Sequence, residues 1–394
     1  MPNHFFPRAL AVASLAAIPI ASFADGGAAT AFNPKISLIL NGTFAHYSSD
    51  APADMPGFLL GGESDLLKSG LSLGETELAV ESNVDDLFHA WAAISMDQDD
   101  HVHVEEAYVN TLQLPDGFTL KLGRFFSAIG YQNSQHAHAW EFVDAPLVYR
   151  AFLGGQLGDD GGQIRWLAPL PVFLDIGVEL YRGAAFPGDG IPGKTVFAHL
   201  GDDLGANWSY RVGASYLAMN SEDRRTGDPI ETSFTGRSRM AGADVVFKWA
   251  PNGNPVQRNA VLQGEFYRRT EHGGVIYDPS GSANASDYDG KQWGFYVQGV
   301  YQFIPQWRAG VRYDRVHADN TLDDPAPGTT LALLADDMGR DPQRWSAMVD
   351  WSHSEFSRIR LQYNRDESRP NRVADNQVFL QYIFAIGSHP AHSF

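Results

Sequence analysis

The strongest constraint on the fold is an alternation of apolar and polar residues that recurs along most of the chain. Between residues 358 and 364, Ile359, Leu361 and Tyr363 alternate with arginine, glutamine and asparagine. A period of two places one kind of side chain on each face of a β-strand. The pattern occurs in 16 segments, at 35–46, 70–83, 87–96, 102–113, 118–124, 161–168, 172–181, 195–202, 205–219, 236–250, 256–271, 290–304, 306–317, 342–352, 356–366 and 375–387.

The connections between these segments alternate in length. Every second one is tight and rich in the turn formers Pro, Gly, Asn and Asp, as at 114–117 and 251–255. The others, such as 125–160 and 318–341, are mostly long, with 97–101 as the exception. Short turns at one end and long loops at the other are typical of a transmembrane β-barrel, which must close because lipid cannot satisfy a free sheet edge. We therefore predict an all-β, antiparallel, up-and-down transmembrane barrel of about 16 strands, with both chain ends on the short-turn, periplasmic side.

Composition and the N-terminus indicate the compartment. The chain has no cysteine and a formal net charge of −18, which exclude a disulfide scaffold and argue against a nucleic-acid partner. Residues 1–24 resemble a secretory signal peptide, because a short apolar run ends in a small-x-small cleavage pattern. We expect residues 25–34 to be a short periplasmic segment, 35–387 the barrel and 388–394 a tail, in the bacterial outer membrane. Aromatic residues near strand ends should form interfacial girdles: Trp208, Trp249, Trp293, Phe303, Trp307, Trp345 and Trp351.

The connection 125–160 carries more aromatic residues than an exposed loop should hold. A barrel of this size has a lumen wide enough for water. We expect the loop to fold into the lumen and narrow it; the alternative is a loop that caps the outside or packs at a subunit interface.

Five residues are candidate metal ligands. His101, His103 and Glu105 share one strand face, and His136 and His138 repeat the His-x-His spacing in the long loop. Imidazole and carboxylate groups suit Zn²⁺, and separate segments commonly complete one site. We expect these residues to meet at the pore mouth. The alternative is a set of solvated polar residues at a loop opening.

Charged residues predicted by strand parity to line the pore fall into two groups. Acidic residues dominate the early strands and arginines the later ones, which would give a transverse field across a water-filled pore. Local ion pairs between neighbouring strands are the alternative. The predicted pore-lining residues are Glu75, Glu77, Glu81, Asp175, Glu179, Arg211, Arg308, Arg312, Arg358 and Arg360.

Several stretches carry a family resemblance over nearly the whole mature chain. The segments SLGETEL (72–78), VHVEEAYV (102–109), RWLAP (165–169) and above all the long loop, GRFFSAIGYQNSQHAHAWEFVDAPLVYRAFLGG (123–155), are similar to porin-like barrels known as zinc-regulated, TonB-dependent outer-membrane receptors. The resemblance implies an outer-membrane barrel tied to zinc supply. Energised receptors carry a folded plug ahead of a larger barrel, and residues 25–34 leave no room for one.

Two enzyme-like motifs lack the context that their chemistry needs. The G-x-S-x-G at 70–74 opens an alternating strand, whereas a nucleophile elbow joins a strand to a helix. The G-x-G-x-x-G at 188–193 contains a proline and precedes no helix. We therefore expect no enzyme but a passive channel for small solutes, with zinc or a small zinc complex as cargo and no resident cofactor. A general cation- or anion-selective porin and a surface-binding or adhesive barrel are the alternatives. Outer-membrane lipid is an expected partner, and a homo-oligomer is compatible with the sequence.

Overall fold

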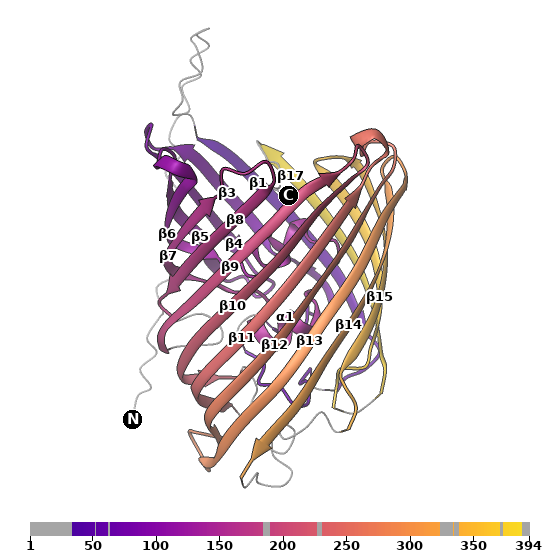
Figure 1. Ribbon diagram of the computed structural model, residues 1–394. Helices are drawn as coiled ribbons and strands as arrows, with labels where there is room; N and C mark the ends of the chain where they lie inside the picture. Colours follow the sequence, from indigo (N-terminus) through magenta and orange to yellow (C-terminus); the bar gives the residue numbers. More distant parts are fainter. Residues whose placement is uncertain are drawn as a thin grey trace, which may run out of the picture.

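The computed structural model describes residues 34–51, 53–61, 64–183, 190–226, 231–323, 334, 339–370 and 373–387. They form one antiparallel sheet that closes on itself between β1 and β17 (Figure 1). The predicted signal peptide, residues 25–33 of the predicted periplasmic segment, the tail 388–394 and residues 188–189 of the G-x-G-x-x-G motif lie outside the described residues. Among the described residues, no helix is long and apolar enough to span a membrane.

Within the described residues, the barrel contains 17 strands and short helical turns. The strands are β1 Lys35–Tyr47, β2 Gly70–Leu73, β3 Thr76–Asn83, β4 Phe88–Met96, β5 Val102–Thr111, β6 Phe118–Phe126, β7 Gly158–Leu167, β8 Phe173–Tyr181, β9 Gly190–Leu204, β10 Trp208–Arg225, β11 Thr232–Trp249, β12 Asn259–Tyr277, β13 Asn284–Ile304, β14 Trp307–Leu322, β15 Gln343–Ser354, β16 Ser357–Asp366 and β17 Asp375–Gly387. The helical elements are η1 Pro115–Gly117, η2 Gln132–Ser134, η3 Ala137–Ala139, α1 Leu147–Leu153 and η4 Pro251–Gly253.

The predicted segment 70–83 is interrupted, which corrects the expectation of one continuous strand. Both β2 and β3 pair with β1, one beyond the other, so together they occupy one strand position in the wall. The 17 strands therefore fill 16 strand positions, or staves, around the barrel, as the sequence predicted. Between them, Gly74 donates its N–H to the carbonyl of Asn41. A Cβ at Gly74 would approach the Asn41 side chain to 3.0 Å, so the break is shaped around this buried amide.

The alternation sorts side chains between lipid and lumen. On β16, Leu361 is 49 % exposed, whereas its neighbours Arg360 and Gln362 are at most 1 % exposed. A soluble sheet would bury the apolar face instead. The exposed apolar face and the polar interior are the arrangement of a barrel whose outer wall contacts lipid.

Aromatic residues on the outer wall gather at two levels. Near the short turns, Trp208 lies against Trp249 and Trp307 against Trp351, with ring centroids 6.3 and 6.5 Å apart. Further along the same strands, Trp345 packs on a tyrosine of β14 at 4.5 Å. Two such levels with apolar residues between them match the interfacial girdles of membrane barrels.

The strands β9 to β14 run beyond their predicted ends on the long-loop side, where they form the tall wall of the barrel (Figure 1). β13, for example, starts at Asn284 rather than near residue 290. The extra residues are mostly polar or glycine on both faces. Period-two alternation fades where neither face meets lipid, so sequence pattern alone ends these strands too early.

Candidate functional site in the barrel lumen

The long connection 127–157 fills the middle of the lumen. It contains η2, η3 and α1, and all seven residues of α1 are buried. The helix contacts the inner faces of β13 and β14 (Figure 1). The aromatic loop therefore lies inside the barrel rather than capping it, and its apolar side chains are enclosed by the wall.

One carboxylate, Glu265 on β12, fastens this loop to the wall. Oε1 accepts hydrogen bonds from the backbone N–H groups of Tyr131 and Gln132, at 3.2 and 2.8 Å. The hydroxyl groups of Tyr149, Tyr267 and Tyr296 donate to the two oxygens at 2.9, 2.6 and 2.7 Å. Five donors saturate a fully buried acceptor, and three of them belong to the loop.

In a second anchor, the carboxylate belongs to the loop and its hydrogen-bond donors belong to the wall. Asp144 receives hydrogen bonds from Arg312 at 2.8 Å and Arg344 at 2.7 Å, and from the amides of Gln362 and Asn364. Burial opposes its ionisation, yet the two guanidinium groups hold the pKa of the Asp144 carboxyl well below its usual value. The loop thus places a carboxylate against arginines of β14 and β15.

Residues 53–61 of the first long loop also lie in the lumen, which the sequence did not predict. Met55 and Phe58 are buried in the same apolar cluster as α1. The carbonyl of Gly57 accepts hydrogen bonds from Gln292 and Asn320 of the wall, at 3.0 and 2.8 Å. The available signal was the apolar run from Met55 to Leu60 within a long loop.

Glutamates of β3 and β5 surround the imidazole of His136. Its Nδ1 lies 2.9 Å from Glu77 and 3.0 Å from Glu105, and its Nε2 lies 3.1 Å from Glu106. The nearby His138 has its Nδ1 3.4 Å from Glu77. Burial disfavours the charged ring, yet the carboxylates of Glu105, Glu106 and Glu77 hold the pKa of His136 well above its usual value. The three carboxylates therefore favour the protonated, cationic form of this imidazole.

A β-bulge explains why consecutive glutamates reach the same ring. On β5 the register shifts so that Ala93 pairs with Glu106 and Ile94 with Val104, which leaves Glu105 unpaired in the ladder. Residues on either side of such a bulge can face the same way. Strict parity predicts that Glu106 faces lipid, so Glu106 is absent from the ligands predicted from the sequence.

The structure divides the five predicted ligands into two places. His101 and His103 lie 3.5 and 3.4 Å from Asp97, in the turn that precedes β5, and the His101 side chain is 75 % exposed. Potential ligand atoms of Glu77, Glu105 and His136 lie within 4.8 Å of one another. The expectation that His101 and His103 join that group is wrong, because they turn toward Asp97 at the strand end.

Most of the predicted pore-lining residues lie inside the barrel beside a counter-charge. Arg308 pairs with Asp350 at 2.6 Å and with Glu141 of the loop at 2.8 Å. Arg211 contacts Asp244 at 3.3 Å. Three more form ion pairs: Asp175 with Arg165, Glu81 with Lys35, and Arg312 with Asp314 and Asp144. Two others contact the loop. Glu179 accepts hydrogen bonds from Ser127 and Ala128, and Arg360 donates to the carbonyl of Trp140.

The two predicted walls of charge therefore differ in how far they are neutralised. Most arginines of the later strands lie beside aspartates, as local ion pairing predicts. Arg358 differs, because its buried Nε and Nη1 atoms have no hydrogen-bond partner among the described residues. The acidic wall is concentrated around Glu77, while Glu75 lies half-buried in the break between β2 and β3.

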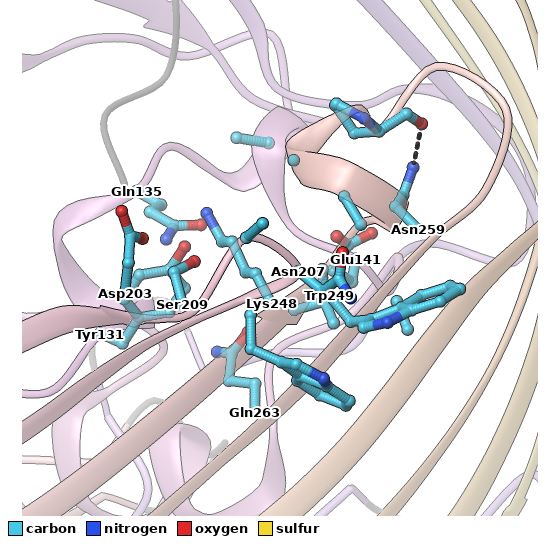
Figure 2. Close-up of a pocket in the computed structure, with 18 of the residues that line it drawn as sticks. Tyr131, Gln135, Glu141, Asp203, Asn207, Ser209, Lys248, Trp249, Asn259 and Gln263 are labelled. Atoms are coloured by element: carbon cyan, nitrogen blue, oxygen red, sulfur yellow. Dashed lines mark hydrogen bonds between the residues drawn. The ribbon is translucent and has the colours of Figure 1, made fainter.

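A cavity of about 680 Å³ opens between the loop and the short turns. Figure 2 shows Gln135 and Glu141 of the loop facing Ser209 and Lys248 of the wall across it. Asp203 lies at the short-turn rim of the same cavity. Polar and charged groups of both signs therefore line a vestibule that leads from the short-turn side to the loop.

Comparisons with known proteins agree with this architecture. No family model matches the chain. An uncharacterized protein of Aquifex aeolicus (strain VF5) is 32 % identical over 396 residues, covering 92 % of this chain and 80 % of that protein. The chain belongs to the same family as this protein. The solved structures similar to this family member share its fold at low sequence identity.

Three of these structures are outer-membrane barrels. OmpT of Vibrio cholerae in its trimer form has a TM-score of 0.54 at 10 % identity, covering 91 % of this chain and all of that one. The channel DcaP of Acinetobacter baumannii has a TM-score of 0.54 at 13 % identity, over 90 and 97 % of the two chains. OprB of Pseudomonas putida has a TM-score of 0.52 at 14 % identity, over 90 and 94 %. They support the porin-like fold; the resemblance to zinc-regulated receptors stays a prediction.

Proposed function

We propose that this protein is an outer-membrane diffusion channel for small solutes, restricted by the two loops that enter its lumen. The observation that carries the proposal is the charged, polar lumen with loop 127–157 tied across it at Glu265 and Asp144. A core built only for stability would not place paired charges around a vestibule, because burying each charge costs several kcal/mol unless it is fully compensated. The fold shared with DcaP and OprB supports the same reading.

The mechanism follows from how the loop divides the lumen. A solute entering from the short-turn side meets the vestibule lined by Lys248, Asp203 and Glu141. It must then pass the loop, where charged walls exchange its hydration shell for fixed charges. In this proposal, passage is passive diffusion down the gradient of the solute.

Planar bilayer recording with a single introduced thiol tests this proposal. The chain is free of cysteine, so Gln135→Cys gives one reactive site in the vestibule. A bulky charged methanethiosulfonate added to the short-turn side should reduce single-channel conductance. Val311→Cys on the lipid face is the matched control and should be insensitive. A purified, folded barrel that gives no conductance steps would instead be a surface-binding or adhesive protein.

A second candidate is a channel that selects zinc or a small zinc complex. The group Glu77, Glu105 and His136 supports it, because one imidazole and two carboxylates within 4.8 Å are suitable ligands for Zn²⁺ as transported substrate. The ion would have to displace the proton that the glutamates favour on His136. Oε1 of Glu105 is also buried without a hydrogen-bond donor among the described residues. A transport site should bind only moderately, since the ion must leave again.

Two double variants separate the zinc channel from a general porin. His136→Ala with His138→Ala should slow zinc uptake by zinc-starved cells, whereas His101→Ala with His103→Ala should not. Potassium conductance of both variants shows whether the barrel still folds and conducts. Equal zinc uptake by all three proteins would leave the general porin as the function. Assembly as a homo-oligomer remains a prediction, supported by the trimer form of OmpT.

A further inference from the structure

The outer wall carries a group of basic residues that the channel does not use. Arg237 and Arg239 on β11, Arg268 on β12 and Lys291 on β13 stand at outward-facing positions of neighbouring strands. Register places them together: Arg239 pairs with Thr270, which pairs with Lys291. With adjacent strands about 4.8 Å apart, the cations of β11 and β13 stand about 10 Å from each other across β12.

Their depth is set by the aromatic residues just below them. Trp293 stacks with Phe266 and Phe295, at 6.4 and 6.3 Å between ring centroids. Lys291 lies two residues beyond Trp293, and Arg268 two residues beyond Phe266, both toward the long loops. Aromatic girdles mark the membrane–water interface, so these cations stand at the level of lipid headgroups on the long-loop side.

The basic residues have few counter-charges of their own. In the part of the chain that the structure describes, no carboxylate oxygen lies within 4.0 Å of Arg237, Arg268 or Lys291. The nearby Asp289 is held by His272 at 2.5 Å. Asp319 faces Lys291 in the strand register without forming an ion pair. Such a group stands out on a chain whose formal net charge is −18.

A groove of about 300 Å³ runs between these side chains. It is lined by Arg237, Arg239, Thr270, Glu271, His272, Asp289, Gly290 and Lys291. Arg268 stands beside this groove, at an exposed position of β12. Guanidinium groups bind phosphate through two parallel hydrogen bonds, and lysine adds a point charge. The groove therefore has donors, positive charge and an apolar aromatic floor directly beneath it, where acyl chains would lie.

We propose that this groove binds the phosphorylated headgroup of an outer-leaflet glycolipid, with its acyl chains along Phe266 and Trp293. The proposal rests on the proposed function and on the orientation predicted from the loop lengths, which places the long-loop side in the outer leaflet. That leaflet consists of lipopolysaccharide, whose disaccharide carries two phosphates, and the spacing between the β11 and β13 cations suits a ligand with two anionic groups.

The test measures lipopolysaccharide binding to the detergent-solubilised full chain. Each basic residue near an anionic lipid surface contributes about 1 kcal/mol, so Arg237→Gln, Arg268→Gln and Lys291→Gln together should weaken binding about 100-fold. The matched control removes three exposed arginines of the same half that already pair with carboxylates, Arg182, Arg225 and Arg365. The control should bind as the parent does.

Further arms identify the ligand. Lipopolysaccharide stripped of its phosphates should bind as weakly as the triple variant, and millimolar inorganic phosphate should not compete. Competition by inorganic phosphate would overturn the lipid assignment in favour of a free-anion site, and equal binding by parent and triple variant would overturn the site itself. Bilayer conductance of the same proteins distinguishes failure of this proposal from failure of the proposed function. If the parent gives no conductance but the triple variant loses lipopolysaccharide binding, the channel is refuted and the lipid site is supported.

Discussion

Removing the carboxylate of Glu265 should release the loop from the lumen without unfolding the barrel. The change Glu265→Ala leaves five buried donors without their acceptor, including the hydroxyl groups of Tyr149 and Tyr296. Each unsatisfied buried donor costs about 1–3 kcal/mol, which gives about 5–15 kcal/mol before relaxation. That is as large as the whole stability of a typical domain, so the structure must rearrange.

The loop is the part that can move, because the wall is held by the continuous backbone ladder of neighbouring strands. We expect larger and noisier single-channel conductance. Trypsin should also cleave after Arg150, which is 4 % exposed in the native loop. Glu265→Gln should give an intermediate effect, since the amide oxygen still accepts but its NH₂ group faces other donors.

Gln298→Ala is the matched control, because this buried amide bonds to Gln263 within the wall and not to the loop. It should leave conductance and protease resistance unchanged. If Glu265→Ala conducts like the parent and its loop stays resistant to trypsin, the carboxylate does not hold the constriction and the argument from its five donors is refuted.

Three further outcomes are expected. A peptide tag inserted after Ser282 should be labelled on intact cells and one inserted at Asn252 should not; the reverse would invert the barrel. Replacing Glu77 and Glu105 with Gln should lower the preference for cations measured by reversal potential, and an unchanged potential would mean that this acidic wall does not govern permeation. Leu361→Arg should destabilise the barrel by about 2–4 kcal/mol if the site lies near the bilayer midplane, measured by urea titration in lipid vesicles, with no change expected if this face does not meet lipid.

The barrel could be predicted from the sequence because its signal is local. Leu361 and its neighbours report which face meets lipid without reference to any other strand, and the turn formers at 251–255 mark a strand end by themselves. Both features repeat along the chain, so an error at one strand does not spread to the next.

The site depends on register, which a single sequence does not reveal. The bulge that brings Glu106 beside Glu105 is a mismatch between two strands and has no local signature in VHVEEAYV. His101 has the right residue type for a ligand, but its place in the turn before β5 directs it to Asp97. The place of residues 53–61 in the lumen could not be predicted, because an apolar run indicates that a segment is buried but does not indicate where.

The anchors of loop 127–157 also set the order in which the protein can be assembled. Asp144 bonds to Arg344, 200 residues later, and the carbonyl of Trp140 to Arg360, 220 residues later. These partners reach the loop only after the last staves have joined the wall, and contacts so distant in sequence form slowly. A newly inserted barrel therefore passes through a stage with its staves in place and its constriction unfastened. During that stage its permeability to solutes exceeds that of the finished protein. Slow docking of the loop would therefore expose the cell to solutes that the mature pore excludes.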